Sequence, residues 1–113
     1  MIKIYHNPRC SKSRQGVKIL ENSKQKFVTI LYLENILKES ELKKIIDLLK
    51  ISPIELVRKN EKIWKENYKG KELSDREIIK AMIENPKLIE RPIVINNDKA
   101  IIGRPPENIL SII

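Results

Sequence analysis

The spacing of apolar residues predicts strands near both ends of the chain and several short helices between them. Residues 2–5 read Ile-Lys-Ile-Tyr, and residues 27–33 are rich in β-branched and aromatic side chains, so both segments are predicted strands. A helix is predicted between them, over residues 11–23. A strand, a helix and a strand this closely spaced predict two parallel strands joined by a right-handed crossover.

The middle of the chain has a helical pattern. Between residues 40 and 49 the apolar side chains recur at helical spacing, at Leu42, Ile45, Ile46 and Leu49. Residues 52–55 and 74–77 each form a capping box, in which a serine is followed three positions later by a glutamate, and such boxes mark helix starts. The first box also has proline at the first helical position. We therefore expect a helical insert of several short helices over residues 38–85.

Strand patterns return near the end of the chain. Residues 92–95 and 100–102 flank Asn96-Asn97-Asp98-Lys99, which has the composition of an antiparallel hairpin turn. Residues 107–113 then have the pattern of an amphipathic helix. The order β-α-β, helical insert, β-β-α predicts an α/β protein with the thioredoxin-like arrangement, a mixed four-stranded sheet flanked by helices.

Length and hydropathy limit the class of protein. A chain of 113 residues has room for one modest core, so we expect a single domain over 1–113 that includes the insert at 38–85. No apolar run approaches the roughly 20 residues that a membrane helix needs, and the first residues lack the basic and then apolar layout of a signal peptide. We therefore expect a cytoplasmic protein without a membrane partner, and we take a monomer as the default for its oligomeric state, which the sequence leaves open.

The chain has a single cysteine, Cys10, and a single histidine, His6. One cysteine cannot form an internal disulfide. The two residues do not make a credible zinc cluster either, so we expect no metal and no bound cofactor. Any redox cycle at Cys10 must therefore take its second thiol from another molecule.

Cys10 lies at the predicted start of the helix at 11–23. Three cations are close to it in sequence, namely Arg9, Lys12 and Arg14. The positive end of the helix dipole and the unpaired backbone N–H groups lower the pKa of a thiol at this position, and neighbouring cations add to the effect. Such a thiolate is suited to attack an anionic substrate. The alternative, a buried and inert cysteine, fits these polar surroundings poorly.

Positive charge gathers in the first part of the chain. Residues 1–26 carry seven Lys or Arg against one Glu, a net charge of +6, whereas the other 87 residues carry sixteen against fourteen, a net charge of +2. Such a segment suits nucleic acid, small oxyanions or solubility alone. Proteins that bind nucleic acids usually place several aromatic residues among their cations, and this chain has only five aromatics. We therefore expect no nucleic-acid partner.

Residues 10–13 read Cys-Ser-Lys-Ser, the C-x-x-S form of the dithiol motif. Ser13 cannot resolve a disulfide, but its hydroxyl can donate a hydrogen bond to the Cys10 thiolate. His6 can either tune the thiol and move protons or make a structural hydrogen bond in the loop, and both interpretations stay open. Cysteine phosphatases place an arginine six positions after the nucleophile, where this chain has Gly16, so phosphatase chemistry is disfavoured.

Three arginines stand apart from the lysine-rich background, namely Arg58, Arg91 and Arg104. A planar guanidinium binds tetrahedral oxyanions through two hydrogen bonds, which lysine cannot match. Each arginine could equally be a surface ion-pair residue. Arg91 precedes Pro92 at the place where a thioredoxin-like fold has its cis-proline beside the active-site thiol. Most X–Pro bonds are trans, so the isomer stays open here.

The chain resembles the glutaredoxin-dependent arsenate reductase family over essentially its whole length. The matching motifs are Tyr5-His6-Asn7-Pro8 through Cys10 and Ser13, Leu31-Tyr32-Leu33-Glu34, Arg58-Lys59-Asn60, Glu90-Arg91-Pro92-Ile93-Val94 and Gly103-Arg104-Pro105-Pro106-Glu107. By this resemblance Cys10 is the catalytic cysteine, and Ser13 and His6 support its thiolate. The three arginines, Arg58, Arg91 and Arg104, bind the oxyanion. The chain ends soon after Glu107 and so looks most like the short chromosomal branch, whose physiological substrate is open.

The resemblance also implies a reaction, the thiol-dependent reduction of arsenate or a similar oxyanion. The Cys10 thiolate attacks arsenate while arginines balance the developing charge. Glutathione then adds as a co-substrate, glutaredoxin takes the mixed disulfide, and arsenite leaves. Two external thiols are what a single-cysteine enzyme requires.

Two other functions remain open from the residues alone. A thiol-switch regulator that binds RNA polymerase shares the expected fold and insert, although many such proteins have C-x-x-C where this chain has Ser13, and they lack the full set of arginines. A broader glutathione-linked thiol reductase would use the same pocket for a glutathionylated substrate or another anion. Protection of Cys10 from alkylation by arsenate or phosphate would distinguish an oxyanion site from this last alternative.

Overall fold

The structure is a computed structural model that describes all 113 residues. They form two compact units, one made of Met1–Asn35 with Arg91–Ile113 and the other of Ile36–Glu90. The first unit contains the strands β1 (Ile2–Tyr5), β2 (Phe27–Ile30), β3 (Ile93–Asn96) and β4 (Lys99–Ile102), the helix α1 (Ser11–Asn22) and the 3-10 helix η3 (Pro106–Ser111). The second contains α2 (Glu39–Leu49), α3 (Lys62–Asn67) and α4 (Asp75–Glu84), with the 3-10 helices η1 (Pro53–Leu56) and η2 (Pro86–Leu88). None of these helices is both long enough and apolar enough to span a bilayer.

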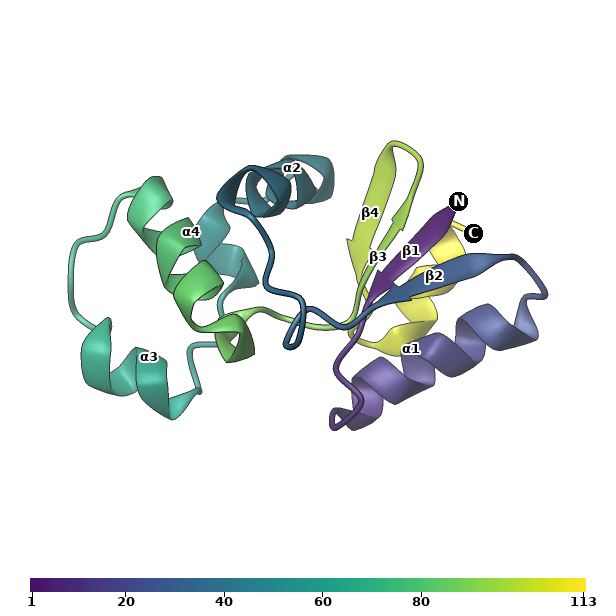
Figure 1. Cartoon of the computed structure of the whole chain (residues 1–113), viewed down its shortest axis with the longest axis horizontal. Helices are drawn as coiled ribbons and strands as arrows, with labels where there is room; N and C mark the ends of the chain where they lie inside the picture. The colour runs from purple at the N-terminus through teal and green to yellow at the C-terminus, as the bar shows by residue number, and fades with distance from the viewer. The chain divides into compact units, whose positions relative to one another are not determined.

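The four strands form one sheet in the order β2-β1-β3-β4 (Figure 1). β1 pairs with β2 in parallel, as predicted, and with β3 antiparallel. β3 and β4 form the predicted hairpin, in which Asn96 pairs with Lys99. Asn97 in the turn has φ 58°, a left-handed conformation that asparagine adopts more readily than most residues. The α/β class and the mixed four-stranded sheet flanked by helices are confirmed.

α1 and η3 lie on the same face of this sheet (Figure 1). Side chains alternate between the faces along a strand, so Ile2 and Ile4 of β1 point to this face while the lysine between them is exposed. They form a core with Val94, Leu20 and Ile109. Complete burial of a side chain such as that of Leu20 contributes roughly 1.5–3 kcal/mol. This core holds α1, and therefore its N-terminal end, against the sheet.

The second unit is built around the buried faces of α2 and α4. The buried residues of these helices are Leu42, Ile45 and Ile46 in α2, and Ile78, Ile79, Ala81 and Met82 in α4. Both predicted capping boxes are present, since the N–H of Ser52 donates to Glu55 at 2.7 Å and that of Ser74 donates to Glu77 at 2.9 Å. The predicted insert at 38–85 lies within this unit.

Two predicted elements differ from the structure in length or type. The strand predicted over 27–33 ends at Ile30, because the next residues form a turn in which two N–H groups donate to the carbonyl of Leu31. The predicted last helix is the 3-10 helix η3. Within and beside it, the side chains of Asn108 and Ser111 donate to backbone carbonyls. Such bonds compete with the regular α-helical pattern.

Candidate active site

The loop between β1 and α1 places Cys10 at the start of the helix. The N–H of Cys10 donates to the carbonyl of Asn7 at 3.0 Å, which closes a turn with Pro8 at its second position. The Asn7 side chain supports this turn by accepting the N–H of Arg9 at 3.0 Å. Cys10 is then the N-cap residue of α1, with extended backbone angles of φ −98° and ψ 122°. The thiol therefore lies at the helix end where unpaired N–H groups gather.

The thiol of Cys10 is partly exposed, and its pKa is lowered. Partial burial acts to raise this pKa. The backbone N–H of Ser13 opposes that effect, followed by a hydrogen bond and the positive charge from Arg91 and by the backbone N–H of Lys12. Each of these groups favours the thiolate, and together they hold the pKa of Cys10 below its ordinary value. The first helical turn and one arginine therefore activate this cysteine.

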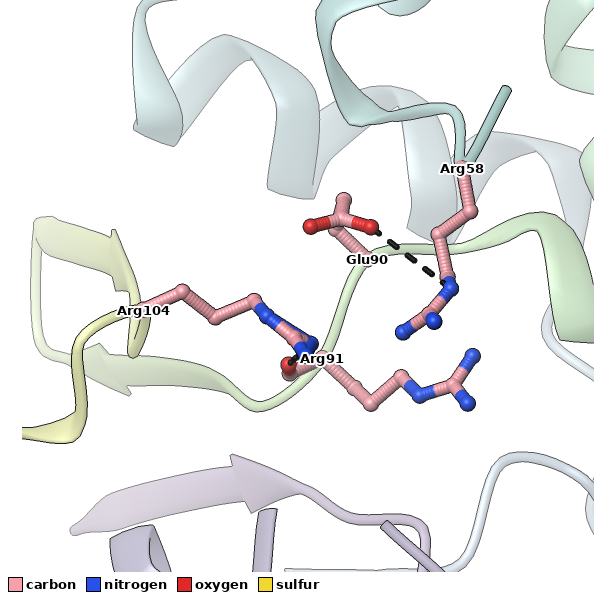
Figure 2. Close-up of polar contacts among 4 residues, drawn as sticks. All are labelled: Arg58, Glu90, Arg91 and Arg104. Carbon is pink, nitrogen blue, oxygen red and sulfur yellow. Dashed lines mark hydrogen bonds and ion pairs between the residues drawn. The ribbon is translucent and has the colours of Figure 1, made fainter. Parts of the chain in front are cut away.

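Arg91 is linked to Arg104 through its backbone. Nη1 of Arg104 donates to the carbonyl oxygen of Arg91 at 3.3 Å (Figure 2). Arg91 precedes β3 and Arg104 follows β4, so the pairing of these strands brings the two residues together. The peptide bonds Arg91-Pro92 and Arg104-Pro105 are both cis. Two of the three predicted oxyanion-binding arginines therefore lie in the same unit as Cys10, and Arg91 interacts with Cys10 itself.

Arg58, the third of these arginines, belongs to the second unit. Its Nε lies 3.7 Å from a carboxylate oxygen of Glu90, a long ion pair between two partly exposed side chains (Figure 2). Both residues line an open cavity of about 340 Å³, which Lys59 and Asn60 also border. Nη1 of Arg58 is buried without a hydrogen-bond partner. The guanidinium thus has a donor left to bind an anion.

The hydroxyl of Ser13 is completely buried beside His6 and Asn7. It lies 2.6 Å from Nδ1 of His6 and accepts the N–H of Asn7 at 3.0 Å. The C-x-x-S motif in the sequence predicts instead that this hydroxyl donates to the Cys10 thiolate. In the structure the Ser13 N–H lowers the pKa of Cys10, while the hydroxyl holds the loop together. His6 makes a structural hydrogen bond within the loop, which is one of the two roles that the sequence leaves open for it.

The pKa of His6 is lowered, first by burial and then by the nearby positive charge of Arg14. The imidazole is therefore neutral at neutral pH. When Nδ1 carries no proton it accepts the hydroxyl hydrogen of Ser13, and the Ser13 oxygen still accepts from Asn7. The Ser13 hydroxyl, the His6 ring nitrogen and the Asn7 N–H then each have a hydrogen-bond partner, and these bonds fix the loop in front of Cys10.

The motifs of the sequence do not reveal the close packing around Pro92. Gly16 of α1 and Gly103 after β4 both lie against the ring of this proline, where an added Cβ would come within 3.0 Å and 2.8 Å of Pro92 Cγ, respectively. A glycine inside a helix costs about 1 kcal/mol relative to alanine. Gly16 within a helical pattern was therefore an available signal of a close approach.

No group of three or more His, Cys, Asp or Glu side chains is placed to hold a metal ion. The groups gathered near the start of α1 are instead a thiol of lowered pKa, backbone N–H donors and the guanidinium of Arg91. This combination favours nucleophilic attack by Cys10 on a molecule that carries negative charge.

Known proteins resemble this chain over nearly its full length. The chain matches the ArsC family over residues 5–112. It is 46% identical to the uncharacterized protein YfgD of Escherichia coli K12, over 99% of this chain and 96% of that protein. It is 45% identical to an arsenate reductase of Haemophilus influenzae, over 97% of each chain. The solved structure of arsenate reductase from Vibrio cholerae superposes with a TM-score of 0.94 at 44% identity, covering 99% of this chain and 97% of that one, and confirms the predicted thioredoxin-like class.

Proposed function

Because this chain belongs to the ArsC family, we propose that it is an arsenate reductase in which Cys10 is the catalytic nucleophile. The observation that carries this proposal is the lowered pKa of Cys10, produced by the start of α1 and by Arg91. Attack on arsenic requires a thiolate, and a cation beside the sulfur attracts an oxyanion. The similarity to arsenate reductases supports arsenate as the substrate.

In the first step the sulfur of Cys10 attacks the arsenic atom of arsenate. A sulfur–arsenic bond forms, and one arsenate oxygen takes up a proton and leaves as water. Arg91 and Arg104 bind the remaining oxygens and balance their negative charge. Arg58 is proposed as a third oxyanion-binding residue from its place in the Arg58-Lys59-Asn60 motif, and its Nη1, which has no hydrogen-bond partner, is the donor it would use. His6 and Ser13 support the thiolate by fixing the loop that precedes it.

The second thiol comes from outside, because the chain has one cysteine. Glutathione attacks as a co-substrate, and its sulfur joins that of Cys10 in a disulfide. The two electrons released reduce As(V) to As(III), which leaves as arsenite. A thiol of glutaredoxin then attacks the glutathione sulfur and frees Cys10 as a thiolate. Both donors belong to a reducing compartment, which supports a cytoplasmic location.

The test is the rate at which the purified chain forms arsenite from arsenate with glutathione and glutaredoxin. We expect Cys10→Ala to abolish the reaction. We expect Arg91→Ala and Arg104→Ala each to lower kcat/KM by about 10²-fold or more, since each removes a donor to the developing charge. Gln15→Ala, at an exposed position of α1, is the matched control and should keep full activity. Undiminished arsenite formation by Cys10→Ala would overturn the proposal.

A second measurement separates an arsenate reductase from a broader glutathione-linked reductase. Arsenate or phosphate should slow the alkylation of Cys10, because an oxyanion bound by the arginines covers the sulfur. The slowing should be lost in Arg91→Ala. If neither anion protects Cys10 while a glutathionylated substrate is still reduced, the chain is a thiol reductase without an oxyanion site.

A further inference from the structure

The ring of Pro92 packs against two glycines from different elements. Gly16 lies in the middle of α1, and Gly103 directly follows β4. A Cβ atom added to Gly16 would lie 3.0 Å from Pro92 Cγ, and one added to Gly103 would lie 2.8 Å from the same atom. Contacts this short require the neighbouring atoms to move, so the proline ring occupies space that the two glycines leave open.

The hydrogen bonds of the sheet hold Pro92 firmly in place. The N–H of Gly103 donates to the carbonyl of Pro92 at 2.8 Å. The next residue, Ile93, begins β3, where it pairs with Tyr5 of β1 on one side and with Ile102 of β4 on the other. β3 is therefore an inner strand, bonded on both edges. A group that presses on the proline ring will move α1 more easily than it moves this strand.

The two segments in contact carry the two parts of the reactive centre. Cys10 is the N-cap residue of α1, six positions before Gly16. Arg91 directly precedes Pro92 and provides both a hydrogen bond and a positive charge to Cys10. An α-helix moves as a rigid rod over two turns, because each turn is bonded to the next. A displacement of the helix at Gly16 will therefore also displace Cys10 relative to Arg91.

We propose that Gly16 is a positioning residue for the reactive centre, since its lack of a side chain lets α1 approach Pro92 closely enough for Arg91 to reach the sulfur of Cys10. The role of the centre rests on the function proposed above, but the placement of the sulfur beside the guanidinium does not depend on the substrate. Gly103, which follows β4, contacts the same proline. Its N–H donates to the carbonyl of Pro92, and its lack of a side chain leaves space for the proline ring.

Gly16 also touches the core, so a loss of stability alone would not identify the contact that matters. Its added Cβ would lie 3.0 Å from Cδ1 of Ile109 and 3.4 Å from Cδ1 of Ile4. The shorter of these core contacts can be removed separately. Ile109→Val deletes Cδ1 and makes room in the core, while the ring of Pro92 stays where it is.

The experiment measures the rate of Cys10 alkylation by iodoacetamide against pH, together with urea unfolding, for the wild type, Gly16→Ala, Ile109→Val and the double variant. We expect the midpoint of alkylation to move to higher pH in Gly16→Ala. At neutral pH its reaction should be slower by about three- to tenfold, because a rise of one pKa unit removes about nine-tenths of the thiolate. In the double variant we expect stability to recover while the midpoint stays high.

Leu20→Ala is the matched control, since it removes a fully buried side chain from the same helix and core, four positions beyond Gly16, and adds no atom toward Pro92. It should lower stability and leave the midpoint unchanged. An unchanged midpoint in Gly16→Ala, or a midpoint restored by Ile109→Val, would overturn the proposal. If Gly16→Ala does not fold, the comparison of Ile109→Val with the double variant gives the same test.

Failure of this proposal and failure of the proposed function are distinguishable. Alkylation involves no arsenate, so a midpoint that does not respond to Gly16→Ala leaves the reductase assay of the wild type unaffected. Conversely, a wild-type chain that forms no arsenite but shows the expected shift in midpoint still has Gly16 as the residue that positions Cys10.

Discussion

The hydroxyl oxygen of Ser13 lies 2.6 Å from Nδ1 of His6, and the same oxygen accepts the N–H of Asn7. The hydroxyl therefore closes the loop before Cys10, whereas the Ser13 backbone N–H lowers the pKa of the thiol. One residue thus serves the reactive centre in two ways, through its side chain and through its backbone. The two can be separated, because substitution removes the first and keeps the second.

Ser13→Ala should lower stability more than it changes the reactivity of Cys10. The substitution leaves the buried N–H of Asn7 and a ring nitrogen of His6 without a partner, which costs about 1–3 kcal/mol. It keeps the backbone N–H that favours the thiolate. Urea unfolding measures the first effect, and the pH dependence of alkylation measures the second. A rise in the pKa of Cys10 as large as that caused by Arg91→Ala would show that the hydroxyl supports the thiolate after all.

Features set by neighbouring residues were predictable from the sequence. The alternation of apolar residues in β1, the capping box of Ser74 and Glu77 and the Asn97 turn are each specified within a few positions, and each is present. The lowered pKa of Cys10 belongs to the same group only in part, because the helix start and its N–H donors are local features, whereas the positive charge comes from the distant Arg91 and not from the neighbouring cations expected from the sequence. Local sequence patterns were therefore sufficient to predict the part of the reactive centre that contains Cys10 and the start of α1.

Contacts between distant segments could not be predicted in the same way. Whether the Ser13 hydroxyl bonds to Cys10 or to His6 depends on where the loop after β1 lies. His6 stands seven residues before the serine in sequence, and only the fold brings the two side chains together. The packing of Gly16 against Pro92 joins positions at opposite ends of the chain. Such contacts are decided by how the core fills, and no periodicity or spacing encodes them.

Arg91→Ala should raise the pKa of Cys10 and slow its alkylation at neutral pH. The substitution removes both a hydrogen bond to the sulfur and a positive charge beside it. Arg91→Lys keeps the charge without the planar fork, so its pKa should lie between those of the wild type and Arg91→Ala. Arg14→Ala is the control, because Arg14 is not among the groups that shift the pKa of Cys10. Identical alkylation profiles for Arg91→Ala and the wild type would contradict the interaction.

Stability should fall at acid pH partly because of His6. Folding lowers the pKa of His6 below its ordinary value of 6.5, so in the window between the two values the unfolded chain binds more protons than the folded chain. The contribution of His6 is therefore complete above the unfolded pKa and is lost as the pH falls through the folded pKa. His6→Asn has no titratable ring and keeps an amide near the position of Nδ1.

The comparison is the urea unfolding of the wild type and His6→Asn at about pH 7, 6 and 5. The wild type should lose more free energy of unfolding across this range than the variant does. Carboxyl groups titrate in both proteins and cancel in the difference. Parallel losses in the two proteins would mean that the ring of His6 is as easily protonated in the folded chain as in the unfolded one.

Glu90→Gln should strengthen the binding of an oxyanion that uses Arg58. The carboxylate of Glu90 lies 3.7 Å from Nε of Arg58 and competes with any anion for that guanidinium. A long ion pair between partly exposed groups contributes only about 0–1 kcal/mol, so the loss of stability should be small. Release of that interaction should lower the KM for arsenate by up to about fivefold, the equivalent of roughly 1 kcal/mol.

Whether this gain passes through Arg58 is decided by a double-mutant cycle. In an Arg58→Ala background, Glu90→Gln should no longer lower the KM for arsenate, because the guanidinium that it would release is absent. A KM that falls equally in both backgrounds would assign the effect to the charge of Glu90 itself. The pKa of Cys10 should stay the same in all four proteins, since neither residue is among the groups that shift it. A change in KM with constant thiol reactivity would therefore assign Arg58 to substrate binding and leave the activation of the sulfur to Arg91 and the first turn of α1.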